Sequence, residues 1–197
     1  MIILTAGHTG PNSGAQCAAT HFDEGAENIW LRNRIAEILT NDYGLVVLVD
    51  ENEATLQLVK KRIELNAPHI DFVIDRHFNA HSNPNARGTE AIVADDATTL
   101  ELRFASRLAH TTSDALDIPL RCIKSESETP HHRLAMLHLT PQSIILEVCF
   151  CTSPEDVEAY RKNREKLAAD LALAIAELLT SVVSTDNRQQ STDESDR

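Results

Sequence analysis

Three segments of the sequence place polar side chains beside apolar runs, where these side chains could do chemistry. His8 stands in the loop GHTG (residues 7–10), and His77 stands in RHFNAH (residues 76–81), each directly after an apolar run. Glu147 interrupts the apolar run SIILEVCF. A carboxylate is costly to bury without a partner, so Glu147 forms a structural ion pair or acts as a catalytic base whose proton affinity is raised by burial.

The two histidines and the acidic segment DEGAE (residues 23–27) together offer the ligands of a metal ion. Each has a simpler explanation alone: a loop histidine is usually a surface residue, and acidic residues in a first helical turn complement the helix dipole. Two imidazoles and one carboxylate with an open fourth position are typical of a catalytic zinc site. Zinc lowers the pKa of water and polarises a carbonyl group, so the combination indicates a zinc hydrolase with Glu147 as its base.

Alternating strands and helices must position these residues. Short apolar runs predict buried strands, and apolar residues at helical spacing predict amphipathic helices. This alternation implies an α/β fold with a mainly parallel, twisted sheet and helices on both faces, whose active site lies at the carboxyl ends of the strands. The predicted strands are residues 2–6, 45–49, 71–75, 89–93 and 143–150, and the predicted helices are residues 26–40, 53–66, 97–115 and 154–183.

The pattern predicts one domain over residues 1–183 and a tail over residues 184–197. Ser153 and Pro154 are typical of the N-cap and the first residue of a helix, and they open the last predicted helix. From Ser184 onward, STDNRQQSTDESDR contains no apolar residue. Such a segment cannot bury surface, so we expect it to be disordered.

The composition excludes several classes of protein. A formal net charge of −12 argues against a nucleic-acid partner and against docking on anionic lipid. No stretch approaches the ~18 apolar residues of a membrane span, and the N-terminus lacks the pattern of a signal peptide. We therefore expect a protein that is made in the cytoplasm and does not insert into a membrane.

The four cysteines are Cys17, Cys122, Cys149 and Cys151, and no pair has the C-x-x-C spacing of a redox or structural zinc motif. Cys149 and Cys151 flank Phe150 and are expected on one face of a strand. We expect buried free thiols, because free cysteine behaves as a small hydrophobic residue and a disulfide framework is unusual in a chain without a signal peptide.

Four segments, in this order, resemble the zinc-dependent N-acetylmuramoyl-L-alanine amidases of the amidase 3 type, which occur as autolysins and phage endolysins. They are the GHTG loop, a glutamate ahead of the first helix, HFNAH and IILEVCF, and the resemblance extends from about residue 2 to residue 179. It implies that His8 and His77 bind one zinc ion, that Glu147 is catalytic, and that Asn79 contacts the substrate.

The resemblance also favours Glu24 over Glu27 as the third zinc ligand. In the family, the liganding glutamate is followed four residues later by a polar residue and then by the apolar stripe of the helix. Glu24 places Asn28 and then Ile29 at these positions, whereas Glu27 shifts the register.

The sequence departs from the family directly before the second histidine. Asp75 and Arg76 stand where the family usually has a small or apolar pair, and Arg76 should point away from the metal. His131 and His132 fall where the family has a loop near the substrate groove, although surface residues are the simpler explanation. His21 is a weaker alternative ligand.

The activity that the resemblance implies is hydrolysis of the amide bond between N-acetylmuramic acid and L-alanine in peptidoglycan. We expect a monomeric lytic enzyme that reaches the cell wall through a holin-type pore during phage lysis. Two alternatives remain: a zinc peptidase that acts within the stem peptide, and a catalytically inactive wall-binding domain. Glu147 argues against the second, because a binding module has no reason to bury a carboxylate beside a metal.

Overall fold

A six-stranded sheet forms the centre of the molecule. In the computed structural model, which describes residues 1–9, 14–17, 19–50, 56–66, 69–83, 85–139 and 142–193, the strand order is β4-β1-β5-β8-β6-β7. The neighbouring pairs are parallel except β6 and β8, which are antiparallel. The strands are β1 (Ile2–Ala6), β4 (Val47–Val49), β5 (Phe72–Asn79), β6 (Thr89–Val93), β7 (Leu120–Ser125) and β8 (Ser143–Phe150).

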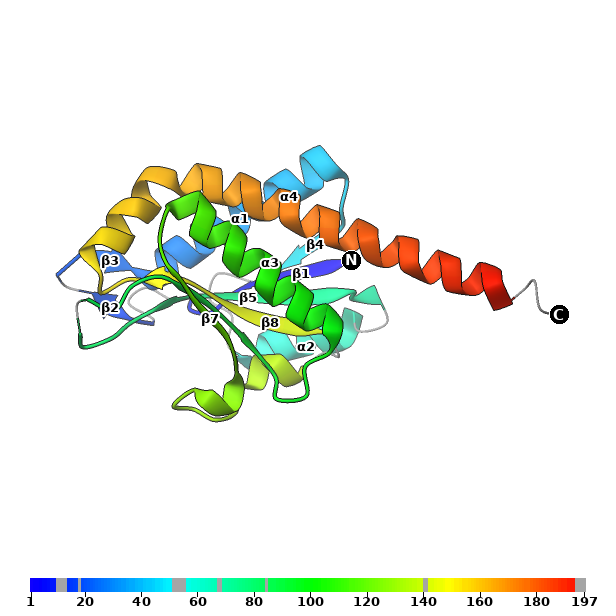
Figure 1. Cartoon of the computed structure of the whole chain (residues 1–197), viewed down its shortest axis with the longest axis horizontal. Coiled ribbons are helices and arrows are strands. Elements are labelled where there is room, and N and C mark those ends of the chain that lie inside the picture. Colours follow the sequence, from blue (N-terminus) through cyan, green and yellow to red (C-terminus); the bar gives the residue numbers. More distant parts are fainter. Residues whose placement is uncertain are drawn as a thin grey trace.

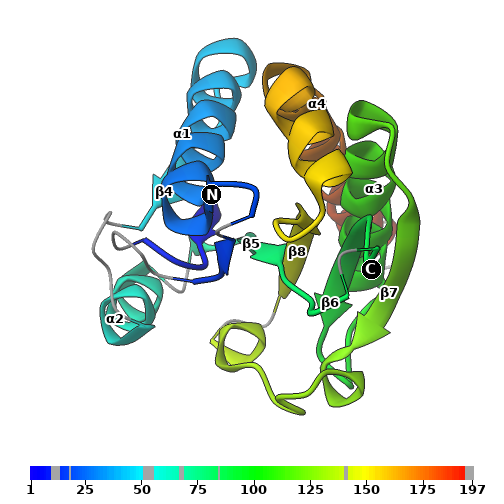
Figure 2. The same cartoon turned by 90° about the vertical axis from the view of Figure 1, so that its left-hand side faces the viewer.

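Helices cover both faces of this sheet, as Figure 2 shows. One face carries α1 (Glu24–Tyr43), α3 (Thr99–Leu116) and α4 (Pro154–Asp193), which lie side by side (Figures 1 and 2). The other face carries α2 (Leu56–Asn66) and the short 3-10 helix η3 (Ala135–His138). A second 3-10 helix, η2 (Glu126–Glu128), follows β7, and a two-stranded hairpin, β2 (Gln16–Cys17) and β3 (Phe22–Asp23), precedes α1. The predicted fold class is confirmed.

Alternation along the strands divides the core between the two faces of the sheet. In β1, Ile2 and Leu4 belong to the large core under α1, α3 and α4, whereas Ile3 packs with Val59 and Ile63 of α2. All of these side chains are buried. The continuous apolar runs of the sequence are therefore explained by a sheet that is covered on both sides.

Most predicted elements are present, with shifted ends. β6 and β8 span the predicted residues, α2 lies within its predicted range, whose residues 53–55 are outside the described part, and α1 begins at Glu24 rather than residue 26. The N-cap of α1 is Asp23, whose Oδ1 accepts the N–H of Ala26 at 3.2 Å. β5 continues to Asn79, so its predicted end at residue 75 was wrong and His77 lies inside the strand.

The last helix extends beyond the boundary predicted at residue 183. Ser153 Oγ accepts the N–H of Asp156 at 3.2 Å, as expected for an N-cap, and α4 then continues to Asp193. Its C-terminal turns extend away from the body of the molecule (Figure 1). The division of the chain at residue 183 stays a prediction, and residues 194–197 lie outside the described part.

Two of the cysteines contradict the expectation of free thiols. Cys17, in the β2–β3 hairpin, and Cys151, in the turn after β8, form a disulfide between residues 134 positions apart. A separation this long hides the pairing in the sequence, because only the fold brings the hairpin to the end of β8. Cys122 and Cys149 are free, and Cys149 is buried as predicted.

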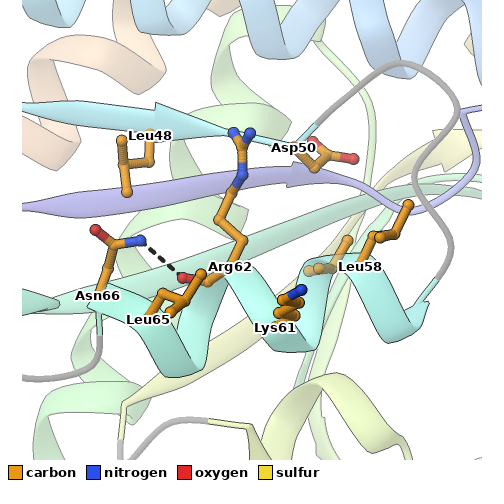
Figure 3. A pocket seen from close by; sticks show the side chains of 8 residues that line it. Leu48, Asp50, Leu58, Lys61, Arg62, Leu65 and Asn66 are labelled. Atoms are coloured by element: carbon orange, nitrogen blue, oxygen red, sulfur yellow. Dashed lines mark hydrogen bonds between the residues drawn. The ribbon is translucent and has the colours of Figure 1, made fainter.

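A pocket of about 390 Å³ lies between the edge strand β4 and α2 (Figure 3). Leu48 and Asp50 line it from the β4 side, and the α2 side includes Leu58 and Leu65, both exposed. It contains none of the predicted site residues. Among the described residues, every helix is too short or too polar to cross a lipid bilayer.

Candidate metal centre

The predicted site residues come from three adjacent strands and one helix. His8 follows β1, His77 is in β5, Glu147 is in β8, and Glu24 is the first residue of α1. β1, β5 and β8 are neighbours in the sheet, and His77 lies directly opposite Glu147 in the strand register. The carboxyl ends of the parallel strands thus bring together residues that are more than 100 positions apart.

His8, Glu24 and His77 form a cluster that could hold a metal ion, with one ligand atom of each within 4.8 Å of the others. Glu24 Oε1 is 3.4 Å from His77 Nδ1 and 3.9 Å from His8 Nε2. The two imidazole rings meet edge to face, with centroids 5.0 Å apart. Two imidazole nitrogens and one carboxylate oxygen are a ligand set that fits zinc, and catalytic zinc sites with three protein ligands take water or substrate as the fourth.

Backbone groups hold the Glu24 carboxylate in place. Its Oε2 accepts the N–H of Ala15 at 2.6 Å, and its Oε1 accepts the N–H of Phe78 at 3.1 Å. Asn28, one helical turn later, is 3.5 Å from Oε1 through its side-chain amide. These bonds orient the carboxylate before any metal binds, as the outer hydrogen bonds of metal ligands generally do.

Two glycines allow this close packing. A Cβ at Gly7 would overlap the imidazole ring of His77, and a Cβ at Gly14 would overlap the carboxylate of Glu24. Gly14 also has φ +76°, which disfavours other residues. Gly7 is therefore needed for space and Gly14 for both space and backbone conformation.

The charges in the cluster suit a cation. Burial raises the pKa of Glu24, but hydrogen bonds from His77, Ala15 and Phe78 together lower it below its usual value. Burial lowers the pKa of His77, but the carboxylates of Asp75 and Glu24 raise it well above its usual value. Burial lowers the pKa of His8. Glu24 is thus ionised at neutral pH, and metal binding at His77 must release a proton.

Glu147 has no structural ion pair within the part of the chain that the structure describes. Its Oε2 is buried without a hydrogen-bond partner. Burial raises the pKa of Glu147 to about 7, and the carboxylates of Glu24 and Glu90 add to this rise against the opposing charge of His77. A carboxyl group with a pKa near neutrality can both accept and return a proton.

The cluster and Glu147 line one pocket of about 380 Å³. Asn79, predicted to contact substrate, also lines it, as does His131. Lys124 of β7 lines it too, and the sequence analysis missed this residue because it missed β7. β7 lies at the edge of the sheet and is only partly buried, so its sequence LRCIKS mixes polar and apolar residues. This mixture was the one feature of the sequence that could have predicted an edge strand here.

The other candidates lie outside the cluster. Glu27 accepts hydrogen bonds from Tyr160 and Arg164, so its carboxylate is already paired. His21 is exposed, and His81 accepts the N–H of Asn83. None of these three is in the group of possible ligands among the described residues.

Asp75 and Arg76, the two residues that depart from the family pattern, lie on opposite faces of β5. Arg76 points away from the cluster, as expected, and its Nη2 donates to the carbonyl oxygen of Thr5 at 2.9 Å. Burial, together with the charge of Arg32, lowers the pKa of Arg76 to about 10. Asp75 lies on the opposite face of the sheet from Arg76, the face of His77, and its Oδ2 is 3.2 Å from His77 Nε2.

Solved structures share this fold over most of the chain. An N-acetylmuramoyl-L-alanine amidase of Clostridium difficile 630 is 23% identical with a TM-score of 0.71, covering 93% of this chain and 96% of that one. An N-acetylmuramoyl-L-alanine amidase of Nostoc punctiforme is 20% identical with a TM-score of 0.70, covering 93% and 97%. The catalytic domain of an endolysin that targets Clostridia difficile is 21% identical with a TM-score of 0.67, covering 89% and 96%.

Sequence comparison identifies the family. No curated protein is similar enough in sequence to count as a relative of this chain. The amidase 3 family, described as N-acetylmuramoyl-L-alanine amidase, matches residues 2–177, which is most of the chain. The match includes the loop of His8, the start of α1, and the strands that carry His77 and Glu147. This chain belongs to the amidase 3 family of N-acetylmuramoyl-L-alanine amidases.

Proposed function

We propose that this chain is a zinc-dependent enzyme that hydrolyses the amide bond between N-acetylmuramic acid and L-alanine in peptidoglycan. One zinc ion would be held by His8, Glu24 and His77. The observation that carries the proposal is the unpaired Oε2 of Glu147, buried in the wall of the pocket that also contains this ligand cluster. A purely structural carboxylate would be paired at such a position.

When bound by His8, Glu24 and His77, zinc would supply the Lewis acidity that lowers the pKa of a water molecule and polarises the scissile carbonyl group. Glu147 takes a proton from the attacking water and returns it to the nitrogen of the leaving amine. Its pKa of about 7 suits both steps, because the group is close to half ionised at neutral pH. Asn79, which lines the same pocket, would contact the substrate through its side chain.

The biological setting is part of the proposal. We propose a monomeric lytic enzyme that is released to the wall through a holin-type pore, as the resemblance to endolysins implies. The Cys17–Cys151 disulfide supports action outside the cytoplasm, because disulfides persist in oxidising compartments. Expression together with a holin should lyse cells, whereas expression of the chain alone should not. Lysis that needs no holin would contradict this route of release.

The first experiment is digestion of purified peptidoglycan, with and without a chelator, followed by mass spectrometry. We expect new N-terminal L-alanine with intact glycan strands, loss of this product on chelation, and its return with added zinc. Cleavage inside the stem peptide would replace the amidase with a peptidase. No release from several wall types would favour a binding domain.

Two variants separate metal binding from catalysis. Glu147→Gln should keep bound zinc and lose turnover by roughly 10²–10⁴-fold, because general acid–base catalysis contributes this much. His77→Ala should lose turnover and bind zinc much more weakly, through His8 and Glu24 alone. Near-normal turnover of Glu147→Gln would exclude the mechanism above.

A further inference from the structure

We infer that Asp75 is a positioning residue for the metal centre. Its carboxylate holds the imidazole of His77 in one orientation and keeps a proton on Nε2, so that Nδ1 presents its lone pair to the metal. The inference rests on the proposed function, because it takes His77 as a zinc ligand. It concerns a residue at which this chain departs from the family pattern.

The two ring nitrogens of His77 face different carboxylates. Nδ1 is 3.4 Å from Glu24 Oε1, on the side of the ligand cluster, and Nε2 is 3.2 Å from Asp75 Oδ2. Asp75 and His77 are two positions apart in β5, and alternate residues of a strand share a face. The strand therefore presents the carboxylate and the imidazole together, with only Nδ1 directed toward the cluster.

Asp75 is itself held rigidly. Its side chain is 4% exposed, and its Oδ1 accepts the hydroxyl of Thr5 at 2.7 Å. Thr5 is the register partner of Asp75 on the neighbouring strand β1 and is also buried. The hydroxyl occupies one carboxylate oxygen, which leaves Oδ2 for the imidazole. An acceptor fixed in this way selects the tautomer in which Nε2 carries the proton.

Arg76, the cation next to Asp75 in the chain, does not replace His77 as the partner of Asp75 Oδ2. Arg76 lies on the opposite face of β5 and donates to the backbone of Thr5. His77 is therefore the group that meets Asp75 Oδ2 directly, and a carboxylate behind a metal-bound histidine raises its basicity and fixes its ring. Loss of such a partner typically weakens metal binding 10- to 100-fold, roughly.

The test measures zinc affinity by competition with a chromophoric chelator. We expect Asp75→Asn to bind zinc at least about tenfold more weakly than the unmodified chain. Thr5→Val keeps the carboxylate but frees it to rotate, and it should weaken zinc in the same direction by less. Asp96→Asn, at an exposed aspartate, is the matched control and should leave zinc affinity unchanged.

Two further measurements separate positioning from general destabilisation. In a His77→Ala background, Asp75→Asn should weaken the residual zinc binding no further. Nitrogen-15 NMR of zinc-loaded protein should show the His77 proton on Nε2, and Asp75→Asn should shift or broaden that signal.

Each outcome decides between the two proposals. Unchanged zinc affinity in Asp75→Asn would overturn the role of Asp75 and leave the zinc amidase proposal intact. An equal loss with and without His77 would overturn it too, because Asp75 would then not act through His77. No zinc binding by the unmodified chain would overturn both.

Discussion

At the scale of single residues, the environment of Glu147 differs from those of the neighbouring carboxylates Glu24 and Glu90. Glu24 accepts backbone N–H groups and has a lowered pKa, whereas Glu147 lacks a partner at Oε2 and has a raised one. Glu90, opposite Glu147 in β6, is paired with Arg121 and Lys124. Glu24 and Glu147 line the same pocket, and such different environments would suit one carboxylate to bind a metal and the other to act as the proposed base.

The raised pKa of Glu147 makes the stability of the metal-free protein depend on pH. Because folding favours the neutral form, the stability from this group is fully present below pH 4.5 and is lost as pH rises through about 7. Glu147→Gln removes this dependence. Relative to the unmodified chain, the variant should gain roughly 2 kcal/mol in the free energy of unfolding between pH 5 and pH 8.

Urea unfolding of both proteins in the presence of a chelator measures this difference. Parallel pH profiles for the two proteins would show that Glu147 is not perturbed in the folded state.

A substitution at Gly7 tests whether the space beside His77 is needed for zinc binding. Since a Cβ at this position would overlap the ring of His77, Gly7→Ala must displace the imidazole. We expect zinc affinity to fall at least about tenfold, as it does when the support of a ligand is lost. Gly44→Ala is the control, because a Cβ there meets nothing within 4 Å, and its φ of +64° makes it the more strained substitution of the two for the backbone. Equal effects of the two variants on zinc binding would contradict the steric explanation.

At the scale of elements, Asp156 joins two parts of the fold to the start of α4. Its Oδ2 accepts the N–H of Gly88 at 2.7 Å and the N–H of Phe150 at 3.1 Å. Its Oδ1 is 3.2 Å from Nε of Arg87. The loop before β6 and the end of β8 are thereby fixed to one helix, and β8 carries Glu147.

Asp156→Ala should lower the free energy of unfolding by roughly 3 kcal/mol, because it leaves buried N–H groups and one arginine without their acceptor. The control is Glu158→Ala, at an exposed position on the same helix, which should change stability by about 0.5 kcal/mol or less. Thermal or urea unfolding compares the two. A loss below about 1 kcal/mol for Asp156→Ala would mean that the network is dispensable.

At the scale of the whole molecule, the disulfide closes most of the chain into one loop. Cys17 and Cys151 are 134 positions apart and connect the hairpin before α1 with the turn after β8. A second contact supports this junction, because Thr20 Oγ donates to the carbonyl oxygen of Cys151 at 2.7 Å. The segment that leads to Glu24 is thus attached to the C-terminal end of β8, the strand that carries Glu147.

Reduction should therefore destabilise the protein. In the chain-entropy model, a crosslink over so long a loop is expected to stabilise the folded state by about 5 kcal/mol through the entropy of the unfolded chain. Guanidinium unfolding with and without reductant should show this loss for the unmodified chain. Cys122→Ser should show the same loss, because Cys122 is not part of the disulfide. The double variant Cys17→Ser/Cys151→Ser should be insensitive to reductant. Identical unfolding of all three proteins would exclude the disulfide as a stabilising link.

Local pattern accounts for most of what could be predicted. The runs that became β1, β6 and β8 had their full spans predicted, because a strand buried on both faces needs a continuous apolar run. The half-buried edge strand β7 was missed, since its partly polar sequence resembles a loop. The extension of β5 to Asn79 was missed for a related reason: the polar residues at its end continue the strand and line the pocket, whereas polar residues after an apolar run usually indicate a turn.

The sequence by itself determined the α/β fold class and the candidates His8, His77 and Glu147, because residue type and strand periodicity are local properties. The resemblance of four ordered segments to a known family added the family and the choice of Glu24. Only the tertiary structure decided which groups meet across long separations. The disulfide of Cys17 and Cys151 and the contact of Lys124 with the pocket depend on the order of strands in the sheet. Asp75 and His77 share a face because β5 continues to Asn79, beyond the end at residue 75 that the sequence predicted.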